Sequence, residues 1–343
     1  MTDTFQPIGA VAARVVEKAR AQTQVQRIPI ADHAAWLAMR KHDVTASVVA
    51  ALLGQGVHDY MTAYELYDLK TGGASDDPEE TGPMRRGRLL EPVAVQLLRE
   101  QQPTWKITHN SGAGAVYLRD PSIRLGATVD VFVEDPARGP GIVQIKSVEG
   151  SVYNRKWRDP DTNELRPPLW IAVQSITEAH LAGAQWAAVA PIVVGFGIDL
   201  PVIEVPVHEG LIKRIRSSVV QFWEMVAAGK APPPDFAKDG ALIARMYDQD
   251  NGETVNLGGN RIVEVVARRD QLKEIESAGT AASKERKDLD VEILHALGEA
   301  TTGILPDGTV ISAKTVRRGA YTVQPTSYRP IKIKPARPPI AAE

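Results

Sequence analysis

The sequence predicts an α/β or α+β fold, in which a central mixed β-sheet is flanked by helices and followed by a C-terminal helical and β-hairpin appendage. Two observations lead to this prediction. Segments with helical spacing of apolar residues surround a pair of strand-like segments, and more strands follow. The proline-rich segment APPPDF (231–236) then ends regular structure, and the residues beyond it are charged and alanine-rich. We expect an N-terminal extension over 1–29, a core over 30–235 and an appendage over 236–343.

Composition excludes several classes of protein. The chain has 343 residues, 43% hydrophobic and 24% charged, which is an ordinary globular mixture. It has no cysteine, which excludes disulfides, thiolate metal sites and a cysteine nucleophile. No apolar run is long enough to cross a bilayer and the first thirty residues lack an apolar signal core, so we expect a cytoplasmic protein without a membrane partner. The net charge of −2 argues against nucleic-acid binding over the whole surface, so any such contact must be local.

The N-terminal third predicts helices separated by polar loops. Residues 10–24 have the spacing of a short amphipathic helix. Residues 34–53 indicate two short helical pieces around the polar segment KHDVTAS. Residues 71–83 are rich in glycine, proline and acid, which is typical of an exposed loop. A helix is expected over 84–100, where Pro92 either starts a new helix or kinks a continuous one.

The middle of the chain predicts strands, then a helix, then strands and a second helix. Two strands are expected over 123–134 and 141–148, joined by a short hairpin connection that contains proline and glycine. A polar loop leads to a helix over 168–189. One or two strands follow over 193–207, and a helix over 210–229 completes the core.

The appendage predicts a helical part and a strand-rich part. Residues 260–298 favour a surface helix or helical hairpin, and residues 303–334 favour short strands joined by turns. Between 308 and 342 there are seven Lys or Arg residues and no acid. This local basic stretch is either a solvated tail or a patch that grips DNA.

Four polar residues of the core are candidates for a chemical site. Asp130 is flanked by two valines in a predicted strand, where a carboxylate is unfavourable unless it is paired or bound to a cation. Gln144 and Lys146 lie on one face of the next strand, because side chains alternate along a strand. Glu91 lies on the preceding helix. If the two strands pair, these residues converge.

Such a set can cleave a phosphodiester. Asp130 and Glu91 would hold Mg²⁺, or Mn²⁺, together with the amide oxygen of Gln144 and the backbone carbonyl of Ile145. Lys146 would stabilise the developing charge or orient the attacking water. Because this spacing also occurs by chance, a structural salt bridge is the alternative interpretation.

Five segments resemble, in order, the motifs of the PD-(D/E)XK nuclease superfamily, and more closely its phage lambda-exonuclease-like group, the YqaJ-type viral recombinase nucleases. The resemblance covers roughly residues 30–205, and the ending GAYTVQPTSYRPIKI is also similar to the ends of some phage members. The five segments are RKHDVTAS (40–47), MRRGRLLEP (84–92), GATVDVFV (126–133), VQIKSV (143–148) and PLWIAVQSITEAHLAG (168–183).

The resemblance implies a restriction-endonuclease-like core and a metal-dependent exonuclease that digests one strand of linear double-stranded DNA from 5′ to 3′. The remaining single strand would pass to an annealing protein in phage-type recombination, and some members are ring-shaped trimers. The implied roles are 5′-phosphate binding by Arg40 and Ser47, metal binding by Glu91, Asp130 and Gln144, catalysis by Lys146, and lining of the site by Gln174.

Gln144 is the departure from the family pattern, because the usual residue there is Glu or Asp. A neutral amide is a weaker Mg²⁺ ligand and leaves the site one negative charge short, although related nuclease groups carry glutamine here. Glu149 or Glu178 could supply the missing charge. Two alternatives stay open: an endonuclease of the same superfamily, and a DNA-end-binding protein with weak catalysis.

Other polar and aromatic residues have simpler interpretations beside functional ones. Arg40 can be an exposed helix-end residue, Ser47 a helix cap and Gln174 an ordinary polar helix position. Histidines 109 and 180 are expected to be structural. A cluster of aromatic and cationic residues after the second strand either contacts nucleic acid or forms a surface loop around a packed tryptophan. Its members are Tyr153, Arg155, Lys156, Trp157 and Arg158.

Overall fold

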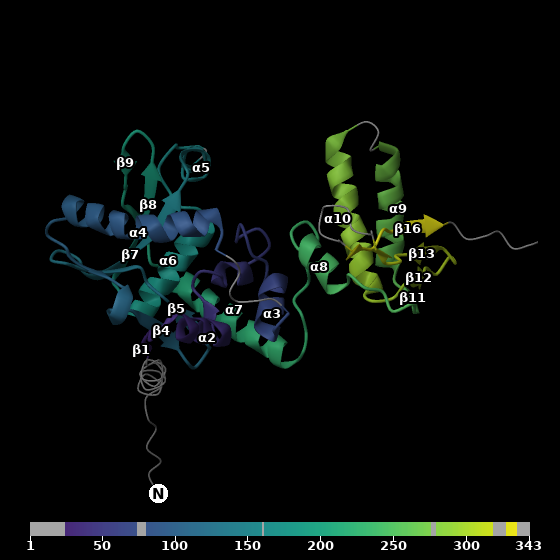
Figure 1. Cartoon of the computed structure of the whole chain (residues 1–343), viewed down its shortest axis with the longest axis horizontal. Helices are drawn as coiled ribbons and strands as arrows, with labels where there is room; N and C mark the ends of the chain where they lie inside the picture. Colours follow the sequence, from purple (N-terminus) through teal and green to yellow (C-terminus); the bar gives the residue numbers. More distant parts are fainter. Residues whose placement is uncertain (1–24, 74–79, 160, 276–278, 318–326, 335–343) are drawn as a thin grey trace, which may run out of the picture. The chain divides into compact units, whose positions relative to one another are not determined.

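The computed structural model of the chain describes residues 25–73, 80–159, 161–275, 279–317 and 327–334. The chain forms two compact units, the first ending at Pro232 and the second beginning at Pro233, within the predicted APPPDF segment (Figure 1). The helix expected over residues 10–24 lies outside the described residues.

A mixed central sheet dominates the first unit. Strand β7 is parallel to β8 and antiparallel to β6, while β3 and β10 are antiparallel additions to β6 and β8. A short strand, β9, folds back on the end of β8. The bounds are Lys106–His109 for β3, Val131–Asp135 for β6, Gly139–Val148 for β7, Trp186–Val194 for β8, Ile198–Asp199 for β9 and Ile203–Val205 for β10.

Two helices cover opposite faces of this sheet, because β7 is apolar on both. Helix α4 (Gly82–Gln101) packs Ala94 and Leu98 against Val143 and Ile145, as Figure 1 shows where it lies across the strands. Helix α6 (Leu169–Ala182) packs against the alternate residues of β7, including Ile142. The predicted α/β class is therefore correct. Helix α4 is continuous and contains Pro92 in its interior, so Pro92 does not start a new helix.

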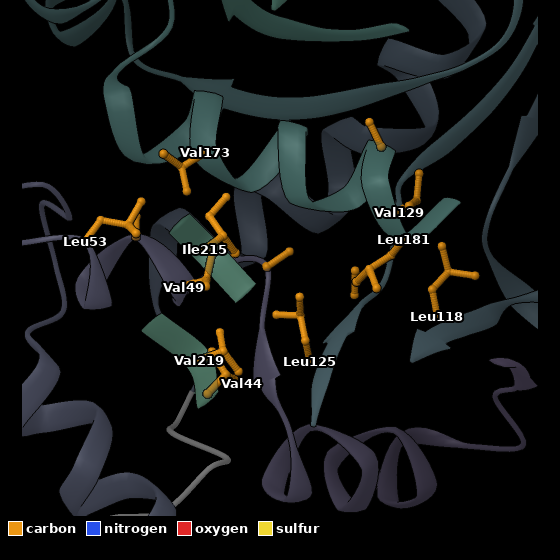
Figure 2. Packing of buried hydrophobic residues seen from close by; sticks show 14 of the residues in the cluster. Val44, Val49, Leu53, Leu118, Leu125, Val129, Val173, Leu181, Ile215 and Val219 are labelled. Carbon is orange, nitrogen blue, oxygen red and sulfur yellow. The ribbon is translucent and has the colours of Figure 1, made fainter. Parts of the chain in front are cut away.

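A second, smaller sheet lies beside the central one in the order β1–β4–β5–β2. Its buried side chains pack against α6 and α7, as Figure 2 shows for Val44, Leu125, Val173 and Val219. The strands are β1 (Gln26–Pro29), β2 (Val44–Thr45), β4 (Val116–Asp120) and β5 (Leu125–Ala127), and the helices are α2 (His33–His42), a 3₁₀ turn (Val49–Leu52), α3 (Ala63–Thr71) and α7 (Glu209–Ala227). Residues 26–29 were expected in the extension but form β1.

The predicted strand over 123–134 is wrong as a single element. Leu125–Ala127 forms β5 in the small sheet, whereas Val131–Asp135 forms β6 in the central sheet. Asp130 therefore precedes β6 at the crossing between sheets instead of lying late in a strand. Both halves have strand-like composition, and only their different pairing partners separate them.

The predicted helix over 168–189 is too long. It ends at Gly183, whose φ of 68° suits glycine and whose N–H bonds back to the carbonyls of Ala179 and His180. Residues 186–189 belong to β8, which is buried along most of its length. A continuous apolar run of this kind is typical of a parallel strand and is hard to distinguish from a buried helix. A short helix, α5 (Gly150–Lys156), also replaces the start of the expected loop.

The second unit is a helical hairpin packed on short strands, as predicted. Its core joins α9, α10 and the strands through residues such as Val265, Ile293 and Ile311. The guanidinium of Arg329, from the basic stretch, is buried and donates to the Ala313 carbonyl at 2.8 Å. The elements are α8 (Gly240–Met246), β11 (Thr254–Asn256), α9 (Asn260–Ile275), α10 (Thr280–Leu297), β12 (Thr302–Ile304), β13 (Val310–Ser312), β14 (Val316–Arg317), β15 (Ser327–Tyr328) and β16 (Lys332–Lys334).

Among the described residues, none of the helices combines the length and apolarity needed to span a membrane.

Candidate active site

The carboxylate of Asp130 lies against the middle of β7. Its Oδ2 accepts a hydrogen bond from the backbone N–H of Ile145 at 2.8 Å and another from the side-chain Nε2 of Gln144. Burial, and then the neighbouring Glu91 carboxylate, raise the pKa of Asp130 to about 7, while Lys146 opposes this shift. The expected approach of Asp130, Gln144 and Lys146 is thus present in the structure, through the sheet crossing before β6.

Lys146 is held by a chain of hydrogen bonds that runs to α6. Its Nζ donates to Oε1 of Gln174 at 2.9 Å, and Nε2 of Gln174 donates to Oε1 of Glu178 at 2.8 Å. Gln174 and Glu178 lie one turn apart on α6, so one helix face carries both. These two hydrogen bonds fix the orientation of the Gln174 amide, because its oxygen must face the Lys146 ammonium and its nitrogen must face the Glu178 carboxylate.

Glu178 is a buried acid in the middle of this site. The residue is 1% exposed, and its second oxygen, Oε2, has no hydrogen-bond partner within the described part of the chain. Burial, and then the negative charge of Asp130, raise the pKa of Glu178 to about 8. The two carboxylates therefore interact across the site.

Glu91 reaches the site from α4 and is bound to a histidine. Its Oε1 lies 2.7 Å from Nε2 of His109, and Nδ1 of His109 lies 3.0 Å from the Ser111 hydroxyl. His109 was expected to be structural, and it orients a predicted site residue. The charge of Glu91 is close enough to raise the pKa of Asp130.

Ser47 is connected to the site through an aromatic pair. The ring of His58 bonds to the Ser47 carbonyl at 3.0 Å and packs against Trp170, with ring centroids 4.9 Å apart. The Nζ of Lys146 lies 5.6 Å from the centre of the same Trp170 ring. Sequence analysis missed Trp170, although it precedes Gln174 by four residues and so shares its helix face.

Arg40 lies near the end of α2, with its guanidinium over the ring of Trp36 at 4.5 Å. The indole N–H of Trp36 donates to the hydroxyl of Thr128, two residues before Asp130. Arg40 and the site are therefore linked through the segment that crosses between the sheets.

The donor atoms fit a hard divalent cation. The Asp130 carboxylate, the Gln144 amide and the Ile145 carbonyl are oxygen ligands of the type that Mg²⁺ prefers. Gln144 is 3% exposed, and its Oε1 has no hydrogen-bond partner among the described residues, which is unusual for a buried acceptor. Rotating the amide by half a turn would bring this oxygen beside Asp130, where a cation can bridge the two.

A cation bound here would meet less negative charge than the motif of the nuclease group that the sequence resembles provides. Among the described residues there is no group of three or more His, Cys, Asp or Glu side chains that could hold a metal ion. The neutral Gln144 stands where a third acid is usual in the resemblance, and Glu178 contacts Gln174. Metal binding would therefore depend on amide and backbone oxygens as well as carboxylates.

The remaining candidates are mainly structural. Trp157 is 2% exposed, so it cannot stack on a base, and its interpretation as a packed tryptophan is correct. Lys156 pairs with Asp59 at 2.6 Å. Burial lowers the pKa of His180, whose Nε2 faces the guanidinium of Arg216.

Part of the first unit is similar to known viral recombinase and exonuclease proteins. Residues 35–185 match the model of the YqaJ-like viral recombinase domain. An alkaline exonuclease from Laribacter hongkongensis is 24% identical over 57% of this chain and 92% of its own, with a TM-score of 0.43. A phage-related exonuclease from Haemophilus somnus 129PT is 13% identical over 55% of this chain and 96% of its own, with a TM-score of 0.40. None of the curated proteins matches the chain.

Proposed function

We propose that this chain, which carries a YqaJ-like viral recombinase domain over residues 35–185, is a metal-dependent exonuclease that digests one strand of linear double-stranded DNA from 5′ to 3′. The observation that carries the proposal is the position of Lys146, whose ammonium is held by Gln174 near the half-buried Asp130 carboxylate. A lysine and a carboxylate with further oxygen donors are the groups that phosphodiester hydrolysis needs.

The side chains would have two roles, metal binding and stabilisation of the charge on the phosphate. Asp130, Gln144 and the Ile145 carbonyl would hold Mg²⁺ or Mn²⁺, with Glu91 as a further carboxylate. When bound, the cation polarises the scissile phosphate and lowers the pKa of a water molecule. Lys146 would neutralise the charge that develops on the phosphate oxygens.

Two residues would act through Lys146. The Gln174 oxygen holds its ammonium, and Glu178 fixes the Gln174 amide so that the oxygen faces the lysine. A lysine on a flexible stem gains precision from such a support, because fewer rotamers are left to it.

The DNA end and the partners are further parts of the proposal. Ser47 and Arg40 would bind the 5′ phosphate, in agreement with the connection of Ser47 to Lys146 through His58 and Trp170. The single-stranded product would pass to an annealing protein, and the enzyme would act as a homo-oligomer, a trimer by the resemblance. Gln144 favours one competing function, a DNA-end-binding protein with weak catalysis, because it leaves the site short of charge.

One experiment separates these functions. Linear duplex DNA with a 5′ phosphate and closed circular DNA are incubated with the protein in Mg²⁺, in Mn²⁺ and in EDTA, and each strand end is labelled in turn. We expect loss of the linear DNA alone, from the 5′ end, and only with a metal. Nicking of the circle would favour an endonuclease. End binding without cleavage in either metal would leave the binding protein.

A further inference from the structure

Glu178 lies at the level of Gln144, on the face of the central sheet that α6 covers. Strands β7 and β8 are parallel and α6 lies between them in the chain, so α6 runs antiparallel to β7. The hydrogen bond from Lys146 to Gln174 fixes how helix and strand are aligned. From this contact, two residues back along β7 is a step of about 6.6 Å, and four residues forward along α6 is a step of about 6 Å. These nearly equal steps place Glu178 opposite Gln144.

Each of these two side chains has one oxygen that the protein leaves unused. Oε1 of Gln144 and Oε2 of Glu178 are buried, and among the described residues neither has a hydrogen-bond partner. Asp130 is a neighbour of both side chains. It accepts a hydrogen bond from Nε2 of Gln144, and its negative charge adds to burial in raising the pKa of Glu178 to about 8. Three oxygen-bearing side chains therefore lie together, with two acceptor atoms that no described donor satisfies.

Support of Gln174 does not by itself explain an acid at position 178. Oε1 of Glu178 accepts the hydrogen bond from Nε2 of Gln174 at 2.8 Å, and the amide oxygen of a glutamine could accept it equally well. A buried carboxylate is unfavourable unless it is paired or bound to a cation. The charge of Lys146 reaches Glu178, but its ammonium donates to Gln174 instead. The carboxylate therefore retains one oxygen for a cation.

We propose that Glu178 is a ligand of the Mg²⁺ or Mn²⁺ ion of the proposed function, on which this inference rests, and that it supplies the negative charge that Gln144 lacks. The cation would bind Oε2 of Glu178 together with the Asp130 carboxylate and the Gln144 amide oxygen, which are all hard oxygen ligands. This set needs only two acids, so it is compatible with the absence, in the described part of the chain, of a cluster of three.

Glu149, the other acid that the sequence offers for this charge, already has partners. It is exposed at the start of α5, where both of its oxygens accept from the backbone N–H of Ser151 and one also accepts from that of Val152. These contacts make it the N-cap of α5. Glu149 is therefore a matched control, because it is an acid close to Lys146 in sequence whose oxygens are used elsewhere.

Calorimetric titration of the full chain with Mn²⁺, without DNA, tests the inference. Glu178→Gln keeps an acceptor for Gln174 and removes the charge, so it should bind Mn²⁺ at least roughly tenfold more weakly than the wild type. Glu149→Gln should bind Mn²⁺ like the wild type. Cooperative urea unfolding of each variant in EDTA checks that it is folded.

A double variant separates a metal ligand from a residue that only supports the fold. Gln144→Glu combined with Glu178→Gln moves the acid from α6 to β7 and keeps the number of carboxylates. It should restore the Mn²⁺ affinity to within severalfold of the wild type. If Glu178 acted only through packing or through the orientation of Gln174, an acid at position 144 would not compensate for its loss.

Equal Mn²⁺ affinity of Glu178→Gln and the wild type, including no binding by either, would overturn the inference. A folded double variant that binds as weakly as Glu178→Gln would also overturn it. Neither outcome depends on DNA cleavage. A chain that degrades DNA, and whose Glu178→Gln variant binds Mn²⁺ normally, retains the proposed function and loses this ligand. A chain that binds Mn²⁺ through Glu178 and never cleaves DNA retains the ligand and loses the function.

Discussion

Replacement of Glu178 by glutamine should make the stability of the first unit depend less on pH. The side chain is buried, and Asp130 adds to the burial in raising the pKa of its carboxyl to about 8. Glutamine has nearly the same shape and does not titrate. Its oxygen can still accept the hydrogen bond from Gln174, so the comparison isolates the charge of the carboxylate.

The sign and size follow from the linkage between protonation and folding. The pKa of Glu178 is raised in the folded state, from an ordinary value of 4.5. Stability is therefore complete below the unfolded pKa and is lost as pH rises through the folded pKa. A shift of this size corresponds to about 3 kcal/mol of lost stability at neutral pH and about 4 kcal/mol near pH 8, with little loss at pH 4.5.

Urea unfolding between pH 5 and pH 8, in EDTA, measures this difference. All six tryptophans lie before Pro233, so tryptophan fluorescence reports the first unit alone. The free energy of unfolding of Glu178→Gln minus that of the wild type should grow with pH by about 3 kcal/mol over this range. Glu224→Gln, at an exposed position of α7, is the control and should show no such growth. A difference that stays constant across the range would refute the account of Glu178 as a buried neutral acid.

Three further predictions follow from the same contacts. Gln144→Glu should bind Mn²⁺ roughly tenfold more tightly than the wild type in a calorimetric titration, because it adds a negative charge beside Asp130. The same charge should make the variant less stable than the wild type in EDTA. Weaker Mn²⁺ binding would contradict the ligand assignment. Gln174→Met should lower the rate of DNA digestion by roughly 10- to 100-fold, as expected for a support of the catalytic lysine. It should also lower the melting temperature, because it removes the hydrogen bond to the buried Glu178. An unchanged rate would exclude that support. Asp43→Ala should destabilise the first unit by about 3–5 kcal/mol in urea unfolding, because it removes the buried carboxylate whose Oδ2 lies 2.9 Å from Nε of Arg119. A loss of stability below about 1 kcal/mol would show that the ion pair contributes little.

The placement of Gln144 and Lys146 on one face of β7 was predictable from the sequence because its signal is local. The alternation Gln144–Ile145–Lys146 fixes two side chains on one face of a strand in any sheet, and the structure has them on that face. The break before Asp130 was not predictable in this way. Both sides of it favour strand, and the choice between two sheets depends on partners distant in the sequence.

Two features of helix α6, its C-terminal boundary and the role of its polar face, were difficult to predict from the sequence. Gly183 is a typical helix end, so the correct boundary could have been found, but the apolar run after it also fits a helix. Trp170, Gln174 and Glu178 share one face at four-residue spacing. The pattern itself is common in helices, and only the packing of that face on β7 distinguishes it from an ordinary amphipathic one.

The central claim is that Lys146 acts on a phosphodiester, and one measurement tests it most directly. The rate of nucleotide release from linear duplex DNA in Mg²⁺ is compared between the wild type, Lys146→Ala and Lys213→Ala, where Lys213 is an exposed lysine on α7. The account predicts that Lys146→Ala loses activity by at least roughly 100-fold and that Lys213→Ala keeps it. Equal rates for Lys146→Ala and the wild type would contradict the account.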